Sequence, residues 1–181
     1  MRELLVEKGV ISADEVRKVV EDIESRTPEG GARVVARAWS DPKFKAELLR
    51  DATAACEAMG FEMALYDVKL TVVENTPEVH NMVVCTLCSC YPRMLLGLPP
   101  AWYKSRAYRS RAVREPRAVL REFGLDLAPE VTVRVHDSTA DLRYLVLPMR
   151  PPGTERMSEA ELVKLVNRDS MIGTAIIKAP A

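Results

Sequence analysis

The sequence predicts an α+β fold in two parts, a helical N-terminal arm over residues 1–60 and a mixed-sheet, layered α/β/β/α domain over residues 61–181. Two observations predict it. Apolar residues recur at helical spacing through the first third of the chain. Short β-branched runs, which are typical of strands, begin only after Val68 and alternate with further helical stretches. At 181 residues the chain is long enough to bury a hydrophobic core.

The helices of the arm carry start and stop signals. Ser12 and Glu15 form a capping-box pattern at the head of a charged helix that runs to about Ser25. A second helical stretch follows, and a third begins after Pro42. Because glycine is favoured just past the end of a helix, Gly60 is the expected end of the third.

The second part of the chain mixes helices with strands. A basic helical region is expected from Trp102 to Phe123, with an interruption at Pro116, because proline lacks the amide hydrogen that a helix interior needs. Ser158 opens the last helix with a second capping box. The expected strands are residues 69–73, 81–84, 131–135 and 142–147.

The charge balance and the lack of targeting signals exclude some classes of partner. The chain has 26 basic and 26 acidic side chains, so no net field attracts nucleic acid or an anionic membrane surface. Its start lacks the uninterrupted apolar stretch of a secretory signal, and no segment approaches membrane-spanning length. We therefore expect a cytoplasmic protein with reduced thiols and with neither a nucleic-acid nor a membrane partner.

Three of the four cysteines, Cys85, Cys88 and Cys90, lie within six residues. In a reducing compartment this crowding indicates a metal site, because metal binding removes thiol protons and favours thiolates. A structural zinc site would need a fourth ligand, for which His80 is the candidate. An iron–sulfur cluster typically takes four cysteines, and Cys56 lies far away on the apolar face of a helix.

A further interpretation uses the main chain as a ligand. Cys88 and Cys90 flank Ser89, so both sulfurs can bind one ion while the amide nitrogens between them point at it. A sufficiently acidic trivalent metal could displace those amide protons, leaving one coordination position open for chemistry. Spacing alone leaves this site, a redox-silent zinc loop and simple buried thiols as alternatives.

The cysteine run and its surroundings resemble the metal-binding alpha subunit of nitrile hydratase. The resemblance is carried first by residues 84–92, VCTLCSCYP, and by residues 96–104, LGLPPAWYK. It covers nearly the whole chain, continuing through residues 31–39, 51–54, 73–77, 113–117, 144–148 and 169–173.

The resemblance implies a ligand set. Cys85, Cys88 and Cys90 would supply sulfur, and the main-chain nitrogens of Ser89 and Cys90 would bind as deprotonated amides. In that family the position of Cys88 becomes a sulfinate and that of Cys90 a sulfenate. Thr86, between the first two cysteines, favours low-spin Co(III) over iron, loaded with the help of an activator or metallochaperone.

The implied reaction is hydration of a nitrile to a carboxamide by a hydro-lyase. The metal would polarise the nitrile or activate water, and Cys90 and Ser89 are the expected catalytic residues, with the Cys90 sulfenate oxygen a candidate nucleophile. The resemblance also implies a beta-type subunit, whole or split into two chains, that supplies arginines to the oxidised sulfurs and a tyrosine near the substrate. The chain alone would then be an incomplete enzyme.

Arg93 departs from this pattern, because the alpha subunits carry tryptophan at that point. The related thiocyanate hydrolase, whose gamma subunit carries the same cysteine motif, has arginine there. Arg93 is therefore a candidate substrate-binding residue for thiocyanate or for a bulky, polar nitrile, and a salt bridge to a partner subunit is the alternative. Outside this superfamily, the competing hypothesis is a non-catalytic zinc-binding interaction module built from the cysteines and His80.

Other residues give weaker signals. By the resemblance, Asp137 and Arg143 are expected behind the metal ligands or at a subunit contact, and a simple surface pair is the alternative. The arginines and tyrosines between Lys104 and Arg121 could form a nucleic-acid patch, but the neutral charge favours a solvated helix face or a subunit interface.

Overall fold

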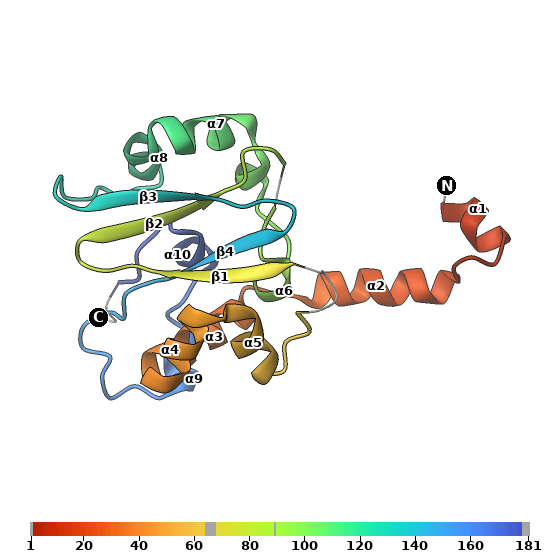
Figure 1. Ribbon diagram of the computed structural model, residues 1–181, viewed down its shortest axis with the longest axis horizontal. Coiled ribbons are helices and arrows are strands. Elements are labelled where there is room, and N and C mark those ends of the chain that lie inside the picture. The colour runs from red at the N-terminus through yellow and green to blue at the C-terminus, as the bar shows by residue number, and fades with distance from the viewer. Residues whose placement is uncertain (1, 64–67, 89, 179–181) are drawn as a thin grey trace.

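The computed structural model describes residues 2–63, 68–88 and 90–178. Two helices begin the chain, α1 (Arg2–Glu7) and α2 (Ala13–Ser25), and they project away from the rest of the molecule (Figure 1). The predicted capping box is present, since the Ser12 side chain accepts from the Glu15 amide and the Glu15 carboxylate accepts from the Ser12 amide. None of the residues of α2, all of which the structure describes, is buried.

Four strands form two parallel pairs. β1 (Lys69–Glu74) pairs with β4 (Leu142–Leu147), and β2 (Val79–Val84) pairs with β3 (Thr132–Asp137). The predicted strands are confirmed to within two residues at each end, but strands that follow each other in the sequence do not pair. Parallel neighbours need a long crossover, and the segment between β2 and β3 supplies one that is largely helical. The α+β class is thus confirmed, with a parallel ladder in each described sheet.

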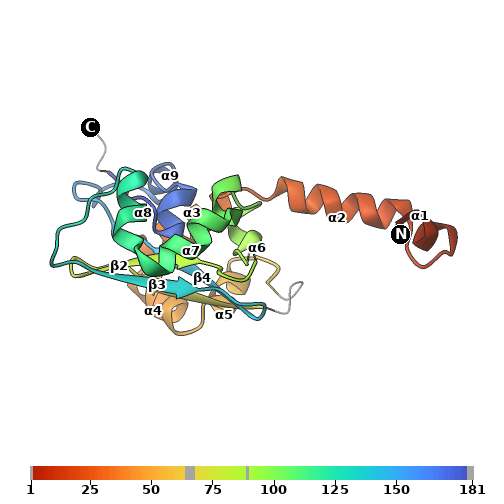
Figure 2. The ribbon, with the colours of Figure 1, turned by 90° about the horizontal axis from the view of Figure 1, so that it is seen from above.

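Helices cover the strands on two sides (Figures 1 and 2). α4 (Pro42–Arg50) and α5 (Ala52–Ala58) contact β1, and α3 (Glu29–Ser40) packs against α4 and α9 (Glu159–Val163). The helices beyond β3 are α7 (Arg106–Arg114) and α8 (Pro116–Glu122), with the predicted break at the proline confirmed. Shorter elements are α6 (Arg93–Leu96), the 3-10 helix η2 (Ala101–Lys104) and α10 (Arg168–Ile172).

The predicted third helix is wrong in one respect, because it is two helices. Asp51 interrupts it between α4 and α5, and its side chain accepts a hydrogen bond from the Ala54 amide at 3.1 Å. Aspartate at this position caps the second helix, since its oxygen satisfies an amide that has no partner within the helix. The apolar spacing runs across the break, which hides it in the sequence.

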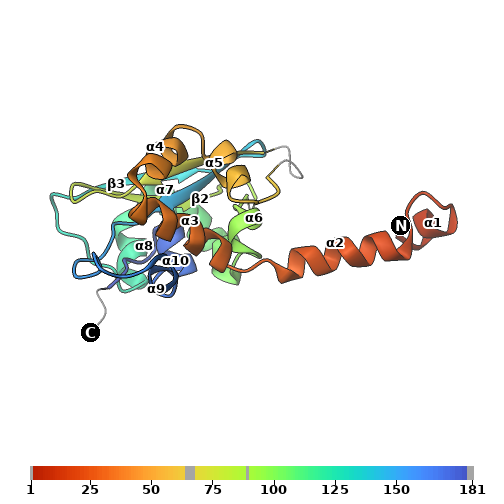
Figure 3. The ribbon, with the colours of Figure 1, turned by 90° about the horizontal axis from the view of Figure 1, so that it is seen from below.

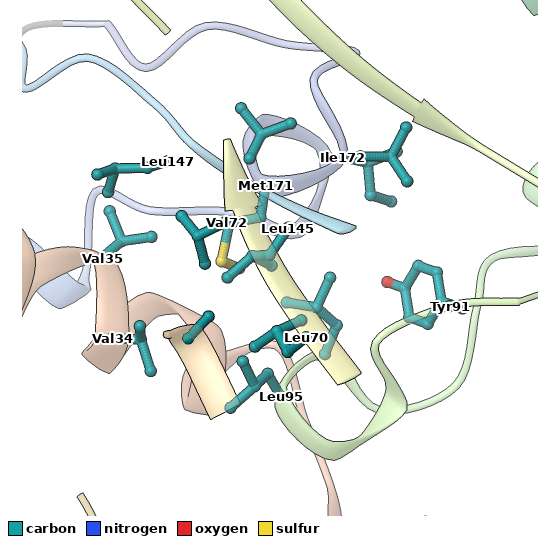
Figure 4. Packing of buried hydrophobic residues seen from close by; sticks show 14 of the residues in the cluster. Val34, Val35, Leu70, Val72, Tyr91, Leu95, Leu145, Leu147, Met171 and Ile172 are labelled. Atoms are coloured by element: carbon teal, nitrogen blue, oxygen red, sulfur yellow. The ribbon is translucent and has the colours of Figure 1, made fainter. Parts of the chain in front are cut away.

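One hydrophobic core joins α3, the strands and α10 (Figure 4). Val34, Leu145 and Met171 are each fully buried in it, from three distant parts of the chain. Within residues 1–60, α1 and α2 project while α3, α4 and α5 contribute to the core (Figure 3). The predicted boundary at residue 60, between a helical arm and the metal-binding domain, stays a prediction.

Gly173 ends α10 in a left-handed conformation, with φ of 85°. A Cβ atom here would lie 1.9 Å from the Asn81 carbonyl oxygen, so only glycine lets this turn pack against β2. Among the described helices, none has both the length and the apolar character needed to cross a membrane.

Candidate metal centre

The cysteine loop begins where β2 ends, at Val84. The Sγ atoms of Cys85 and Cys88 lie 3.5 Å apart, and those of Cys88 and Cys90 lie 3.2 Å apart. All three sulfurs lie within 4.8 Å of one another. The loop therefore brings together the three predicted sulfur ligands, whereas Ser89, predicted as a main-chain ligand and catalytic residue, lies outside the described residues.

The three cysteines differ in their exposure. Cys85 is fully buried, Cys90 is 9% exposed and Cys88 is exposed. Burial, assisted by hydrogen bonds with Cys88 and Cys85, raises the pKa of Cys90 to about 12, although Arg143 opposes the rise. Thiolates this close repel each other unless a cation lies among them. The donor set therefore fits a soft metal ion, whose binding would displace the thiol protons.

His80 is not a fourth ligand, so the predicted Cys3His zinc module is wrong. Its Nε2 donates to the Gly173 carbonyl oxygen at 2.7 Å, and its Nδ1 faces the Asn75 side-chain nitrogen at 3.4 Å. Burial lowers the pKa of His80, so the ring is neutral. His80 lies near the start of β2 and the cysteines follow its end, which separates them by about five residues at about 3.3 Å each.

Asp137 holds the cysteine loop from the end of β3. Its Oδ1 accepts from the Thr86 amide at 2.9 Å, and its Oδ2 accepts from the Thr86 hydroxyl at 2.6 Å. Thr86 lies between Cys85 and Cys88 in the sequence, so Asp137 binds the loop between the first two predicted sulfur ligands. This location matches the expectation for Asp137, although its role stays a prediction.

A cavity of about 280 Å³ opens beside two of the sulfurs. Cys88 and Cys90 line it together with Arg93 and Arg143, so two guanidinium groups and two sulfurs meet at one hollow. Arg143 also donates to the carbonyl oxygens of the β3–β4 connection, including that of Ala140 at 3.0 Å, which fixes it beside Cys90. The structure thus places both predicted arginines at the cysteine site and leaves their roles untested.

Sequence reasoning missed three donors from η2 and α7. The Tyr103 hydroxyl donates to the Cys90 carbonyl oxygen at 2.9 Å, and the Tyr108 hydroxyl donates to the carbonyl oxygen of Val83 at 2.6 Å. Arg109 Nη1 donates to the Thr86 carbonyl oxygen at 3.3 Å. The interpretation of this region as a solvated face is wrong for these residues. The alternation of tyrosines and arginines in the sequence could have indicated a role for this segment. It does not reveal which carbonyl oxygens these side chains contact.

Two other arginines of the basic region, Arg111 and Arg117, are engaged within the chain. Arg111 forms ion pairs with Glu115 at 2.7 Å and with Glu122 at 2.6 Å. Arg117 donates to main-chain carbonyl oxygens of the loop before β3, including that of Leu127 at 3.1 Å. These pairings reduce the positive charge that the helices present to solvent.

Comparison with known proteins now decides the family. The family model described as "Nitrile hydratase, alpha chain" matches residues 1–175. The chain belongs to this family. It is 53% identical to the low-molecular weight cobalt-containing nitrile hydratase subunit alpha of Rhodococcus rhodochrous, over 182 residues that cover 100% of this chain and 87% of that protein.

Two further relatives differ from the first in the activity or the metal type that their names give. The thiocyanate hydrolase subunit gamma of Thiobacillus thioparus is 43% identical, with 98% of this chain and 77% of that protein covered. A structure of an Fe-type nitrile hydratase double mutant from Comamonas testosteroni Ni1 matches with a TM-score of 0.91 and 45% identity, covering 98% of this chain and 86% of that one.

Proposed function

We propose that this chain is the metal-binding catalytic alpha subunit of a cobalt nitrile hydratase, which hydrates a nitrile to the carboxamide. The observation that carries the proposal is the convergence of the Cys85, Cys88 and Cys90 sulfurs at 3.5 Å and 3.2 Å. The 53% identity to a cobalt-containing relative and the presence of Thr86 support cobalt over iron.

The cysteines would hold the ion with two main-chain nitrogens, those of Ser89 and Cys90. The exposures support the proposed oxidation states, because oxidation of a thiol follows its accessibility. Cys88, which is exposed, becomes the sulfinate, and Cys90, which is 9% exposed, stops at the sulfenate. Cys85, which is fully buried, stays a thiolate.

When bound, the cobalt ion supplies a Lewis acid for the nitrile or for water. The chain's own groups bind and orient the reactants. The oxygen on Cys90 is a candidate nucleophile, and Arg143 lies where its charge stabilises negative charge on that oxygen. Cys88 and Cys90 both line the cavity of about 280 Å³, so a substrate in this cavity would lie beside both sulfurs.

The enzyme needs a second subunit. The relative from Rhodococcus rhodochrous is itself a subunit alpha, which supports a beta-type partner, whole or split into two chains. We also assign an activator or metallochaperone for cobalt loading and a cytoplasmic location. The partner would contribute arginines to the oxidised sulfurs and a tyrosine near the substrate.

Arg93 favours a second candidate, a thiocyanate hydrolase subunit. It is exposed and lines the cavity beside Cys88 and Cys90, where a cation can bind an anion such as thiocyanate. The higher identity to the cobalt nitrile hydratase subunit, 53% against 43%, keeps nitrile hydration the main proposal. Arg93 then selects a bulky or polar nitrile.

The test is an assay of the complex of this chain with its beta-type subunit, against thiocyanate and a panel of apolar and polar nitriles. We expect carboxamide production from polar nitriles, and Arg93→Trp to shift the preference towards apolar nitriles. Hydrolysis of thiocyanate without nitrile hydration would establish the second candidate instead. An unchanged preference in Arg93→Trp would refute the role of Arg93.

A further inference from the structure

Three side chains from one short segment reach carbonyl oxygens in the cysteine loop or in the strand that leads into it. Tyr108 donates to Val83 near the end of β2, Arg109 to Thr86 in the loop, and Tyr103 to Cys90 at the end of the loop. The segment comprises η2 and the start of α7, so these two consecutive elements together contact the chain before, within and at the end of the loop.

The two tyrosines are fixed donors. Tyr103 is fully buried and Tyr108 is 6% exposed, and burial raises the pKa of both phenols, so each keeps its proton at neutral pH. Their rings pack edge to face with Trp102, with centroids 6.0 Å and 4.9 Å from it. Because close packing restricts the movement of buried rings, moving the hydroxyls away from the carbonyls would disturb the core.

Thr86 is held from two opposite elements. Asp137 accepts from its amide and its hydroxyl, while Arg109 donates to its carbonyl oxygen. Every polar atom of the residue between the first two sulfur ligands is thus engaged.

We propose that Tyr103, Tyr108 and Arg109 are positioning residues that hold the main chain of the cysteine loop in its metal-binding shape before the metal arrives. The identity of the metal rests on the proposed function, but the restraint of the loop does not. None of the three touches a sulfur in the contacts described above. They act through the carbonyls, which set the direction of the neighbouring amides and of the cysteine side chains.

The experiment compares Tyr103→Phe with Tyr91→Phe in the complex with the beta-type subunit, produced in cobalt-free medium. Tyr91 is the matched control, because it is 2% exposed and packs against Tyr103, yet its hydroxyl has no hydrogen-bond partner among the described residues. Hydrogen exchange of the amides of residues 85–90 is measured in both. We expect exchange to accelerate about tenfold in Tyr103→Phe and to stay at the wild-type rate in Tyr91→Phe.

Cobalt is then supplied at a limiting concentration, and the cobalt content and the wavelength of the sulfur-to-metal charge-transfer band are measured. Substituting a residue that hydrogen-bonds to a metal-binding residue typically lowers the metal affinity by about 10–100-fold. Tyr103→Phe should therefore lose most of its cobalt at that concentration and shift the charge-transfer band. If wild-type complex binds no cobalt, the proposed function fails, while the exchange rates still decide the positioning role.

Arg109 provides a second test in case Tyr103→Phe does not fold. Arg109→Met removes the donor to Thr86 and should accelerate exchange of the loop, whereas Arg109→Lys retains a donor and should restore much of the protection. Wild-type exchange rates in both Tyr103→Phe and Arg109→Met would overturn the proposal, as would equal acceleration in Tyr91→Phe.

Discussion

The contact between Asp137 and Thr86 gives a prediction whose size follows from two hydrogen bonds. Asp137→Asn keeps one oxygen to accept from the Thr86 amide, but its new amide group can only donate to the Thr86 hydroxyl oxygen, so the charge-assisted bond from the hydroxyl to the carboxylate is lost. Thr86→Val removes the same bond from the other side with little change of volume. The two substitutions therefore delete one common interaction.

The magnitude follows from the exposure of the pair. Hydrogen bonds to charged groups contribute about 1.5–3 kcal/mol where they are well buried. Asp137 is exposed and Thr86 is half-buried, so water and salt reduce the bond between the hydroxyl and the carboxylate to about 1 kcal/mol. Each single variant should lose about 1 kcal/mol of unfolding free energy, and the double variant also about 1 kcal/mol, which corresponds to a coupling of about 1 kcal/mol.

The assay is urea unfolding of the metal-free full-length chain, followed by circular dichroism and by tryptophan fluorescence. Coincidence of the two transitions tests whether unfolding is two-state, as the free energies require. Additive losses, with the double variant near 2 kcal/mol, would mean that the side chains of Asp137 and Thr86 do not interact.

Three further substitutions test separate parts of the account. His80→Gln should lower the unfolding free energy by about 2 kcal/mol, because it disrupts buried hydrogen bonds, yet leave the metal content unchanged; loss of the metal would restore His80 as a ligand. Gly173→Ala should cost about 2–5 kcal/mol by urea unfolding, since the left-handed backbone and the clash with Asn81 add, and a loss below 1 kcal/mol would contradict the packing of that turn. Tyr91→Phe should leave the thermal midpoint unchanged or raise it, because the hydroxyl is buried without a described partner, and a marked drop would mean that it has one.

Features encoded locally could be predicted from the sequence. The capping boxes at Ser12 and Ser158 are both present, because each needs only residues three positions apart. The strands are likewise where β-branched runs place them. The pairing of β1 with β4 could not be predicted, since it joins residues about seventy positions apart and depends on how the intervening helices pack.

The candidate site divides in the same way. Cys85, Cys88 and Cys90 are close in the sequence, so their convergence was predictable from spacing. Tyr103 and Arg109 were not recognised, because a donor for a carbonyl leaves no pattern until η2 and α7 are placed against the loop. Composition showed a basic region there, and only the contacts show that it supports the cysteines.

We propose that the three sulfurs hold cobalt in a nitrile-hydrating enzyme. The most direct test is metal analysis with a visible absorption spectrum of the purified complex with the beta-type subunit, made with its activator. We expect one cobalt ion for each copy of this chain and a sulfur-to-metal charge-transfer band, with both lost in Cys90→Ser. Stoichiometric zinc without such a band would contradict the proposal.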